Sequence, residues 1–415
     1  MFSVSSFAGG SLRHRFNYSP IVGFLPVVFF WAMFDFTLAY LLPILMEHSG
    51  FSVLIIGLLI STSSMWGALF DVILSIFSRT NSYRRQFGYL FLVCSFVPIM
   101  LFASQSWIMF LIVMALWGIY YDLYTFGIYK FITHIKIDNA NNTTNFGLVS
   151  VIKAIAAVMT PILIEVFVFD GDNIAILFLM YFFLGLSVLS FYFHRQFSTK
   201  AVEHEIPVQQ SKLKLSIRKE LKVLLRVEKT IKPVLIAKLF LDLVDSFFWT
   251  LGPIISVSLS VGNPFGALFI SAYMIPSLFV GFWVGKLVNP LGKKRTACGA
   301  ILTSSLLFVL LPLITNTPFL ILIVFLASIL NSIAWPAIDG TLADYIEETP
   351  IVEGEIEGLQ DFSGNLGYVI GPICAGLFAT FSSNLGAFAI MGIVGAVLAV
   401  YLFIVTPRKI TVVIS

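Results

Sequence analysis

The residues best suited to proton chemistry share one face of the apolar segment 233–259. Lys238, Asp242, Asp245 and Trp249 are spaced by four, three and four residues, which places them on the same side of an α-helix. Lys238 and Asp242 can neutralise each other, which leaves Asp245 as the acid without a local partner. Because burial favours the neutral form of a carboxyl group, Asp245 is a candidate site of proton binding and release. The alternative is a structural, hydrogen-bonded acid.

Charged residues also interrupt other long apolar segments. Asp35 is the only acid of the first of these segments, and Asp122 and Asp339 lie in two others. A charge in the middle of a lipid bilayer costs at least about 2.5–3.5 kcal/mol, so each such residue is a functional candidate. We expect proton coupling to involve Asp35 and Asp245, with Asp122 and Asp339 as the next candidates.

Polar and aromatic side chains follow one another at helical spacing in two of the segments. Asn331, Trp335 and Asp339 repeat every four residues, which would form a polar and aromatic stripe. Such a stripe suits the wall of a solute cavity; the alternative is packing and anchoring at the membrane interface. The segment 107–130 is enriched in aromatic residues in the same way, with Trp117, Tyr120, Tyr121 and Tyr124. The predicted cavity residues are Trp117, Tyr121, Tyr124, Lys153, Lys238, Asp242, Trp249, Asn331 and Trp335. For Lys153 the sequence leaves two roles open, a counter-charge to an acid or a binding group for an anionic solute.

The elements that must position these residues are membrane-spanning helices. The chain is 58% hydrophobic and only 11% charged, with a mean hydropathy of +0.96, which excludes a soluble domain. Apolar runs of about twenty residues recur, each long enough to cross a bilayer as a helix. We expect twelve spans: 22–45, 52–77, 87–104, 107–130, 146–169, 174–194, 233–259, 265–288, 297–315, 318–343, 358–381 and 385–406.

The placement of basic residues predicts the orientation in the membrane. Six short connections contain no Lys or Arg: 47–50, 104–106, 170–173, 262–264, 316–318 and 382–384. By the positive-inside rule, both termini should face the cytoplasm. The formal net charge of +3 therefore reflects topology and gives no indication of nucleic-acid binding. We expect a multi-pass protein of the cytoplasmic membrane, acting as a monomer.

The chain divides into two similar halves. A six-helix bundle over 1–194 is followed by a charged linker, 195–232, and a second six-helix bundle over 233–415. The linker has the pattern of a basic amphipathic helix that lies on an anionic inner leaflet; a regulatory role is the alternative. Asp35 precedes Pro43 by eight residues, as Asp245 precedes Pro253, which indicates a duplicated unit.

These halves and their motifs resemble the major facilitator superfamily over essentially the whole chain. Gly67 and Asp71, followed by Arg84 and Arg85, resemble the family's loop signature after the second span. The counterpart after the eighth span consists of Gly281, Gly285, Lys293, Lys294 and Arg295. The resemblance implies that these residues form a cytoplasmic gate between the halves, and that the first, fourth, seventh and tenth helices line a central cavity.

Among function classes, the sequence favours a secondary transporter that works by alternating access and is coupled to protons. The balance of acids over bases favours export of a neutral or cationic lipophilic solute. The alternative is proton-coupled uptake of a small polar or anionic nutrient, with Lys153 holding the anionic group. A channel would keep the fold but lose the coupling. No cluster of His, Cys and carboxylate has the spacing of a metal site or a nucleophile, so we expect no enzyme, metal or cofactor.

Overall fold

The computed structural model describes residues 20–77, 82–104, 106–134, 142–168, 173–197, 217–348 and 353–406. Within them the chain forms twelve α-helices and two short 3-10 helices, and no strand. The helices are α1 (Pro20–His48), α2 (Val53–Phe77), α3 (Tyr83–Phe102), α4 (Trp107–His134), α5 (Asn142–Val168), α6 (Asn173–Phe197), α7 (Ile217–Ser260), η1 (Pro264–Ala267), α8 (Leu268–Leu291), α9 (Lys293–Leu310), η2 (Leu311–Leu313), α10 (Thr317–Glu348), α11 (Glu353–Phe381) and α12 (Asn384–Val405).

Ten of the described helices are long and apolar enough to cross a membrane; α7 and α8 are the other two. The apolar part of α7 carries Lys238, Asp242 and Asp245, so it is the most polar of the central helices. In lipid, a helix satisfies all its backbone hydrogen bonds internally, which explains why every apolar segment of the chain adopts this form. The fold is the predicted all-α membrane architecture of twelve helices in the described residues, ten of which meet the length and hydropathy of a membrane span.

The structure shows the linker differently from the expectation. Residues 217–232 do not form a separate surface helix but continue without interruption into α7, which has Pro233 in its interior. Proline has no backbone N–H, so one hydrogen bond of the helix is missing at Pro233, but the helix continues on both sides of it. The rest of the predicted linker, 198–216, lies outside the described residues. The first bundle also ends slightly later than predicted, because α6 continues to Phe197.

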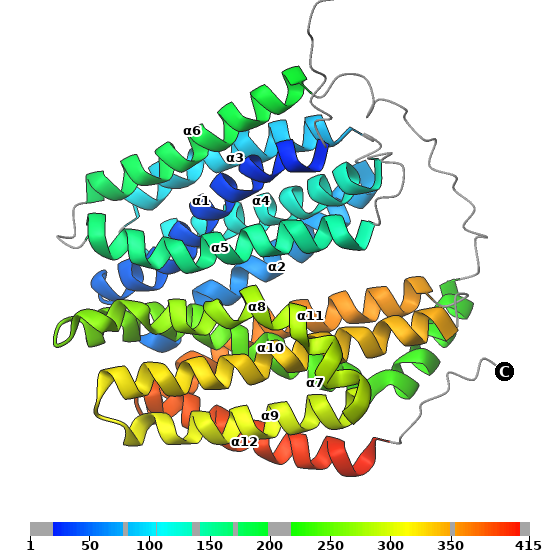
Figure 1. The fold of residues 1–415 in the computed structure, drawn as a ribbon. Helices are drawn as coiled ribbons and strands as arrows, with labels where there is room; N and C mark the ends of the chain where they lie inside the picture. Colours follow the sequence, from blue (N-terminus) through cyan, green and yellow to red (C-terminus); the bar gives the residue numbers. More distant parts are fainter. Residues whose placement is uncertain are drawn as a thin grey trace, which may run out of the picture.

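The helices form two groups of six that lie against each other (Figure 1). In the first group, α1 packs against α5 and α6, α4 against α2 and α3, and α3 against α6. Adding six to each number gives the contacts of the second group: α7 with α11 and α12, α10 with α8 and α9, and α9 with α12. The two groups therefore share one packing pattern.

Contacts between the groups concentrate toward one side of the molecule. We call this side, with the connections 49–52, 261–263 and 382–383, the loop face, and the side with Pro20, Phe197 and Thr406 the terminal face. The main pairs across the halves are α1 with α7, α2 with α11 and α5 with α8. The Tyr40 hydroxyl donates to Ser256 Oγ over 3.1 Å, and the Phe36 and Trp249 rings stack with centroids 5.2 Å apart. These residues lie in the parts of α1 and α7 that lead to the loop face, where the halves are closed.

Glycine allows the closest of these approaches. Gly57 of α2 packs directly on the Pro372 carbonyl of α11, where an added Cβ would overlap the oxygen. Gly376 of α11 meets the Val53 carbonyl of α2 in the same way, at 2.5 Å from an ideal Cβ. Small residues let membrane helices pack backbone to backbone, so α2 and α11 form the tightest seam between the halves.

Candidate functional site

Asp35 lies in the centre of the first half and ties α1 to α4. Its side chain is almost fully buried, with 4% exposed. The Trp117 indole Nε1 donates to Asp35 Oδ1 over 3.1 Å, and the Tyr120 hydroxyl donates to the same oxygen over 2.8 Å. Trp117 and Tyr120 are three residues apart on α4, so both reach α1 from one helix face. The predicted acid therefore has two neutral, aromatic hydrogen-bond donors.

Asp245 has the same kind of environment in the second half, but the donors come from two helices. The Tyr273 hydroxyl of α8 donates to Oδ1 over 2.9 Å, and the Tyr368 hydroxyl of α11 donates to Oδ2 over 2.6 Å. The Tyr273 ring is fixed by stacking on Phe248 of α7, with centroids 3.7 Å apart. A tyrosine hydroxyl can donate to a carboxylate or accept from a protonated carboxyl group. Each acid can therefore gain or lose a proton without losing its partners.

The predicted pair on α7 is present. The Lys238 ammonium lies 3.3 Å from Asp242 Oδ2, with 12% and 4% of the two side chains exposed. The same ammonium lies 4.0 Å from the centroid of the Trp335 ring of α10, so the predicted stripe on α10 faces α7. Asp242 packs on Gly367 of α11, where an added Cβ would come within 2.6 Å of the Asp242 Cβ. These contacts make a neutral, tightly packed cluster.

Lys153 of α5 sits among aromatic rings. Its ammonium lies 5.1, 5.3 and 6.0 Å from the ring centroids of Tyr121, Tyr124 and Trp31, and it donates to the Tyr121 hydroxyl over 3.3 Å. Trp31 and Tyr124 stack on each other with centroids 3.5 Å apart, which holds the cage in place. Lys153 is within electrostatic range of Asp35 in its own half and of Asp245 in the other half.

Other predicted residues lie apart from this group. The Asp122 carboxylate packs against Gly67 of α2, where an added Cβ would come within 2.8 Å of Oδ2, so it faces the α2–α4 contact and not the donors around Asp35. Asp122 follows Tyr120 by two residues on α4, so its side chain points to another side of the helix. Asn331 is buried within the second half. Asp339 accepts a hydrogen bond from Gln360 of α11 over 3.4 Å.

The basic residues proposed for the gate pair inside their own half. The Lys293 ammonium donates to the Gly340 carbonyl over 2.8 Å and to Asp344 Oδ2 over 2.6 Å, which joins α9 to α10. Lys294 donates to the Thr406 carbonyl. Among the described residues, the contacts of Lys293 and Lys294 in this conformation lie within the second half, where the end of α10 places an acid beside Lys293, and the predicted gate stays a prediction. Arg85 and Arg295 are exposed, Arg84 lies beside Tyr83, and the surroundings of Asp71, Gly281 and Gly285 lie outside the described residues.

Sequence reasoning missed three aromatic residues around Asp245 and Lys153, namely Trp31, Tyr273 and Tyr368. Trp31 precedes Asp35 by four residues, so it lies one turn away on the same face, a signal that could have been used. Tyr368 follows Asn365 by three residues and Asp361 by seven, which also places it on a polar face of α11. Tyr273 has no comparable neighbours in α8. Its role follows only from the packing of α8 on α7.

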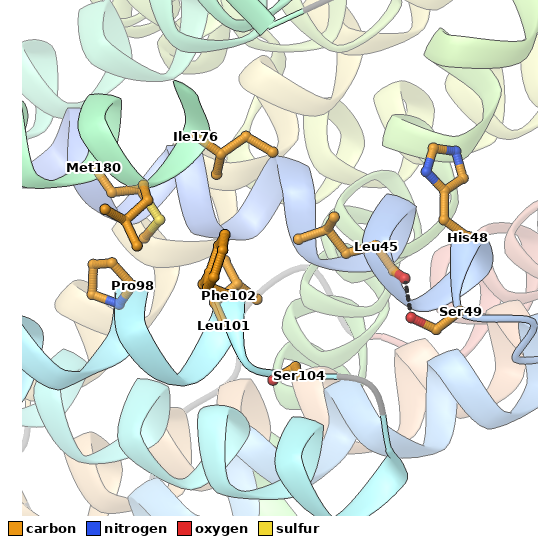
Figure 2. A pocket seen from close by; sticks show the side chains of 10 residues that line it. Leu45, His48, Ser49, Pro98, Leu101, Phe102, Ser104, Ile176 and Met180 are labelled. Atoms are coloured by element: carbon orange, nitrogen blue, oxygen red, sulfur yellow. Dashed lines mark hydrogen bonds between the residues drawn. The ribbon is translucent and has the colours of Figure 1, made fainter. Parts of the chain in front are cut away.

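A hollow in the surface lies away from these residues. A cavity of about 280 Å³ is lined by the ends of α1, α3 and α6 near the loop face, among them Leu45, Pro98 and Met180 (Figure 2). Its only ionisable lining residue is His48. Because the buried acids and Lys153 supply the ionisable groups that this hollow lacks, the chemistry favours the group of Asp35, Lys153 and Asp245 over the hollow as the functional site.

Comparisons with known proteins agree with the fold. Residues 234–414 match the model of the Major Facilitator Superfamily. Among solved structures, the nucleoside transporter NupG superposes with a TM-score of 0.70 at 15% identity, covering 92% of this chain and 97% of that one. The peptide transporter POT in complex with sulfate superposes with a TM-score of 0.71 at 13% identity, covering 95% of this chain and 96% of that one. A bacterial homolog of the human lysosomal transporter Spinster, solved in an inward-facing and unoccupied conformation, superposes with a TM-score of 0.68 at 12% identity. The match covers 95% of this chain and 97% of that one. No curated protein sequence matches the chain.

Proposed function

We propose that the chain is a membrane transporter of the major facilitator superfamily and carries a small solute by alternating access; the match of residues 234–414 to the family model and the shared fold support this. In this proposal the two six-helix halves rock about the central group of Asp35, Lys153 and Asp245. The support is that Lys153 of the first half lies within electrostatic range of Asp245 in the second half, together with the closure of the halves at the loop face. Tyr121 and Tyr368 remain 40% and 36% exposed, and because the halves are closed at the loop face, we infer that the site opens toward the terminal face. From the charge pattern of the sequence, we place that face in the cytoplasm.

We further propose that transport is coupled to protons through Asp245 and Asp35. The observation that carries this proposal is the matched environment of the two acids, each held by two neutral aromatic donors in one half. Such donors accommodate both protonation states, whereas a fixed lysine partner would hold the acid ionised. This distinguishes Asp245 from Asp242, whose partner is Lys238.

The coupling would act through Lys153. This ammonium lies in the first half and is within electrostatic range of Asp245 in the second. Two unit charges attract by about 4 kcal/mol at 4 Å and half of that at 8 Å with an effective dielectric constant of about 20. An ionised Asp245 therefore draws the halves together across the site, and protonation removes that attraction. A change of a few kcal/mol is enough to shift a two-state equilibrium strongly.

The test uses the purified chain in vesicles with an imposed proton gradient and a panel of labelled solutes. Asp245→Asn keeps the size and hydrogen bonding of the side chain but cannot titrate. We expect it to abolish solute accumulation driven by the gradient while solute exchange at equal pH continues, and Asp35→Asn to have a similar, weaker effect. Asp361→Asn is the matched control, because Asp361 is an exposed acid on α11. Gradient-driven accumulation by both the Asp245 and Asp35 variants would exclude these acids as the coupling site.

One observation favours the second candidate solute, a small anion, over the neutral or cationic solutes suggested by the excess of acids. Three of these acids have partners that account for them: Asp242 pairs with Lys238, and Asp35 and Asp245 bind aromatic donors. Within the described part of the chain, the positive charge of Lys153 has no carboxylate in contact; its contacts are the Tyr121 hydroxyl and three aromatic rings.

A further inference from the structure

The two lysines inside the central part of the molecule are in opposite electrostatic situations. Lys238 contacts the Asp242 carboxylate at 3.3 Å. Among the residues that the structure describes, no carboxylate forms an ion pair with Lys153, whose contacts are the Tyr121 hydroxyl and three aromatic rings. A desolvated ammonium without an anion is costly in a membrane. Aromatic faces stabilise it only in part, so the cage holds the charge ready for an anion.

The nearby acids are held away from Lys153 by their own partners. Tyr120 and Trp117 fix Asp35 from α4, and Tyr273 and Tyr368 fix Asp245 from α8 and α11. Each carboxylate is thus oriented toward neutral donors, close enough to Lys153 to interact through space but without contact. The contact position on the ammonium is left to another group.

Aromatic surface lies beside that position on both halves. Tyr121 of α4 and Tyr368 of α11 are among the exposed aromatic residues and lie within electrostatic range of each other across the site. Exposed tyrosine faces suit stacking against a flat ring, and their hydroxyls suit polar substituents. A single ammonium without an arginine beside it matches a singly charged carboxylate better than a phosphate, which favours bidentate arginine.

We propose that the solute is a small organic carboxylate with a flat, ring-bearing body, bound with its carboxylate on Lys153 and its ring between Tyr121 and Tyr368. This inference rests on the proposed transport function and specifies its substrate class. Both tyrosines contribute from opposite halves, so the solute bridges the two bodies that must move. The aromatic cage of Trp31 and Tyr124 positions the ammonium without contacting the carboxylate.

The test measures binding by the full-length chain in detergent, without a gradient. One-ring and two-ring aromatic compounds are each offered as the carboxylate, the primary alcohol and the amine; for one ring these are benzoate, benzyl alcohol and benzylamine. Binding is followed by tryptophan fluorescence and thermal stability. We expect saturable binding of carboxylates only, weakened at least tenfold by Lys153→Gln and partly restored by Lys153→Arg. Lys130→Gln, which removes the same charge nine residues beyond Tyr121 on α4, should bind normally.

The outcomes separate the substrate class from the transport function. Preferential binding of the amines or alcohols, carboxylate binding that survives Lys153→Gln, or no binding across the panel would each overturn the inference. If carboxylates bind through Lys153 but vesicles never accumulate them, the inference holds and the proposed transport fails. If vesicles accumulate an amine under a proton gradient, transport holds and the carboxylate assignment fails.

Discussion

Removing Lys238 should destabilise the second half strongly, because its buried partner would lose its counter-charge. The ammonium lies 3.3 Å from Asp242, whose side chain is 4% exposed, and 4.0 Å from the Trp335 ring centroid. At that ion-pair distance and an effective dielectric constant of about 20, the attraction is about 5 kcal/mol. Breaking a buried pair by deleting one partner costs about 3–5 kcal/mol, whereas replacing both charges together is often near neutral.

The assay is a double-mutant comparison of Lys238→Gln, Asp242→Asn and the double variant, by thermal unfolding of the purified protein. We expect Lys238→Gln to be the least stable of the three and the double variant to recover most of the loss. The loss in Lys238→Gln should also shrink as the pH falls. At low pH a proton neutralises the unpaired Asp242, whereas at high pH its uncompensated charge stays buried.

Two results would refute this reasoning. If the double variant is as unstable as Lys238→Gln, the effect comes from lost packing against Trp335 and not from an unpaired charge. If Lys238→Gln is as stable as the parent protein at neutral pH, water reaches Asp242 and the cluster is not the neutral, packed unit that the contacts indicate.

Three further predictions concern the seam, the proton site and the topology. Gly57→Val should force α2 away from Pro372 and shift the halves from closed to open at the loop face, measured as increased labelling of buried seam positions from that side; unchanged labelling would contradict it. Tyr368→Phe removes a donor to the Asp245 carboxylate, and a hydrogen bond to a charged group is worth about 1.5–3 kcal/mol. Its loss favours the protonated form of Asp245, so the pH profile of gradient-driven transport should shift to higher pH. An unaltered pH profile would show that the bond plays no part. A single cysteine at Ser49 should react only from outside the cell, and labelling from inside would reverse the orientation.

Local sequence spacing was sufficient for the parts of the site that depend on one helix. Lys238 and Asp242 are four residues apart, so any helix through them brings their side chains together. The same reasoning applies to the helices themselves, because an apolar run of about twenty residues can satisfy its backbone in lipid only as a helix. The twelve helices, their membrane character and the α7 ion pair therefore followed from the sequence.

Contacts between distant segments depended on the tertiary structure. Tyr120 lies 85 residues from Asp35, and Tyr368 lies 123 residues from Asp245, so no periodicity within a helix could identify these donors. For the same reason, the sequence left the role of Lys153 open between counter-charge and anion site. Only the packing of α1, α4 and α5 surrounds its ammonium with rings, and only the contacts of α4 with Asp35 and of α8 and α11 with Asp245 turn these acids toward other partners.

The tertiary structure also decided which predicted residues act apart. Asp122 and Tyr121 are adjacent in sequence, but successive residues of a helix point about 100° apart, so the packing of α2 on α4 took Asp122 to Gly67 while Tyr121 remained in the central group. Lys293 met Asp344 because α9 and α10 pack side by side at that end. Sequence determines what each helix can present, whereas the choice of partner depends on which helix faces are pressed together.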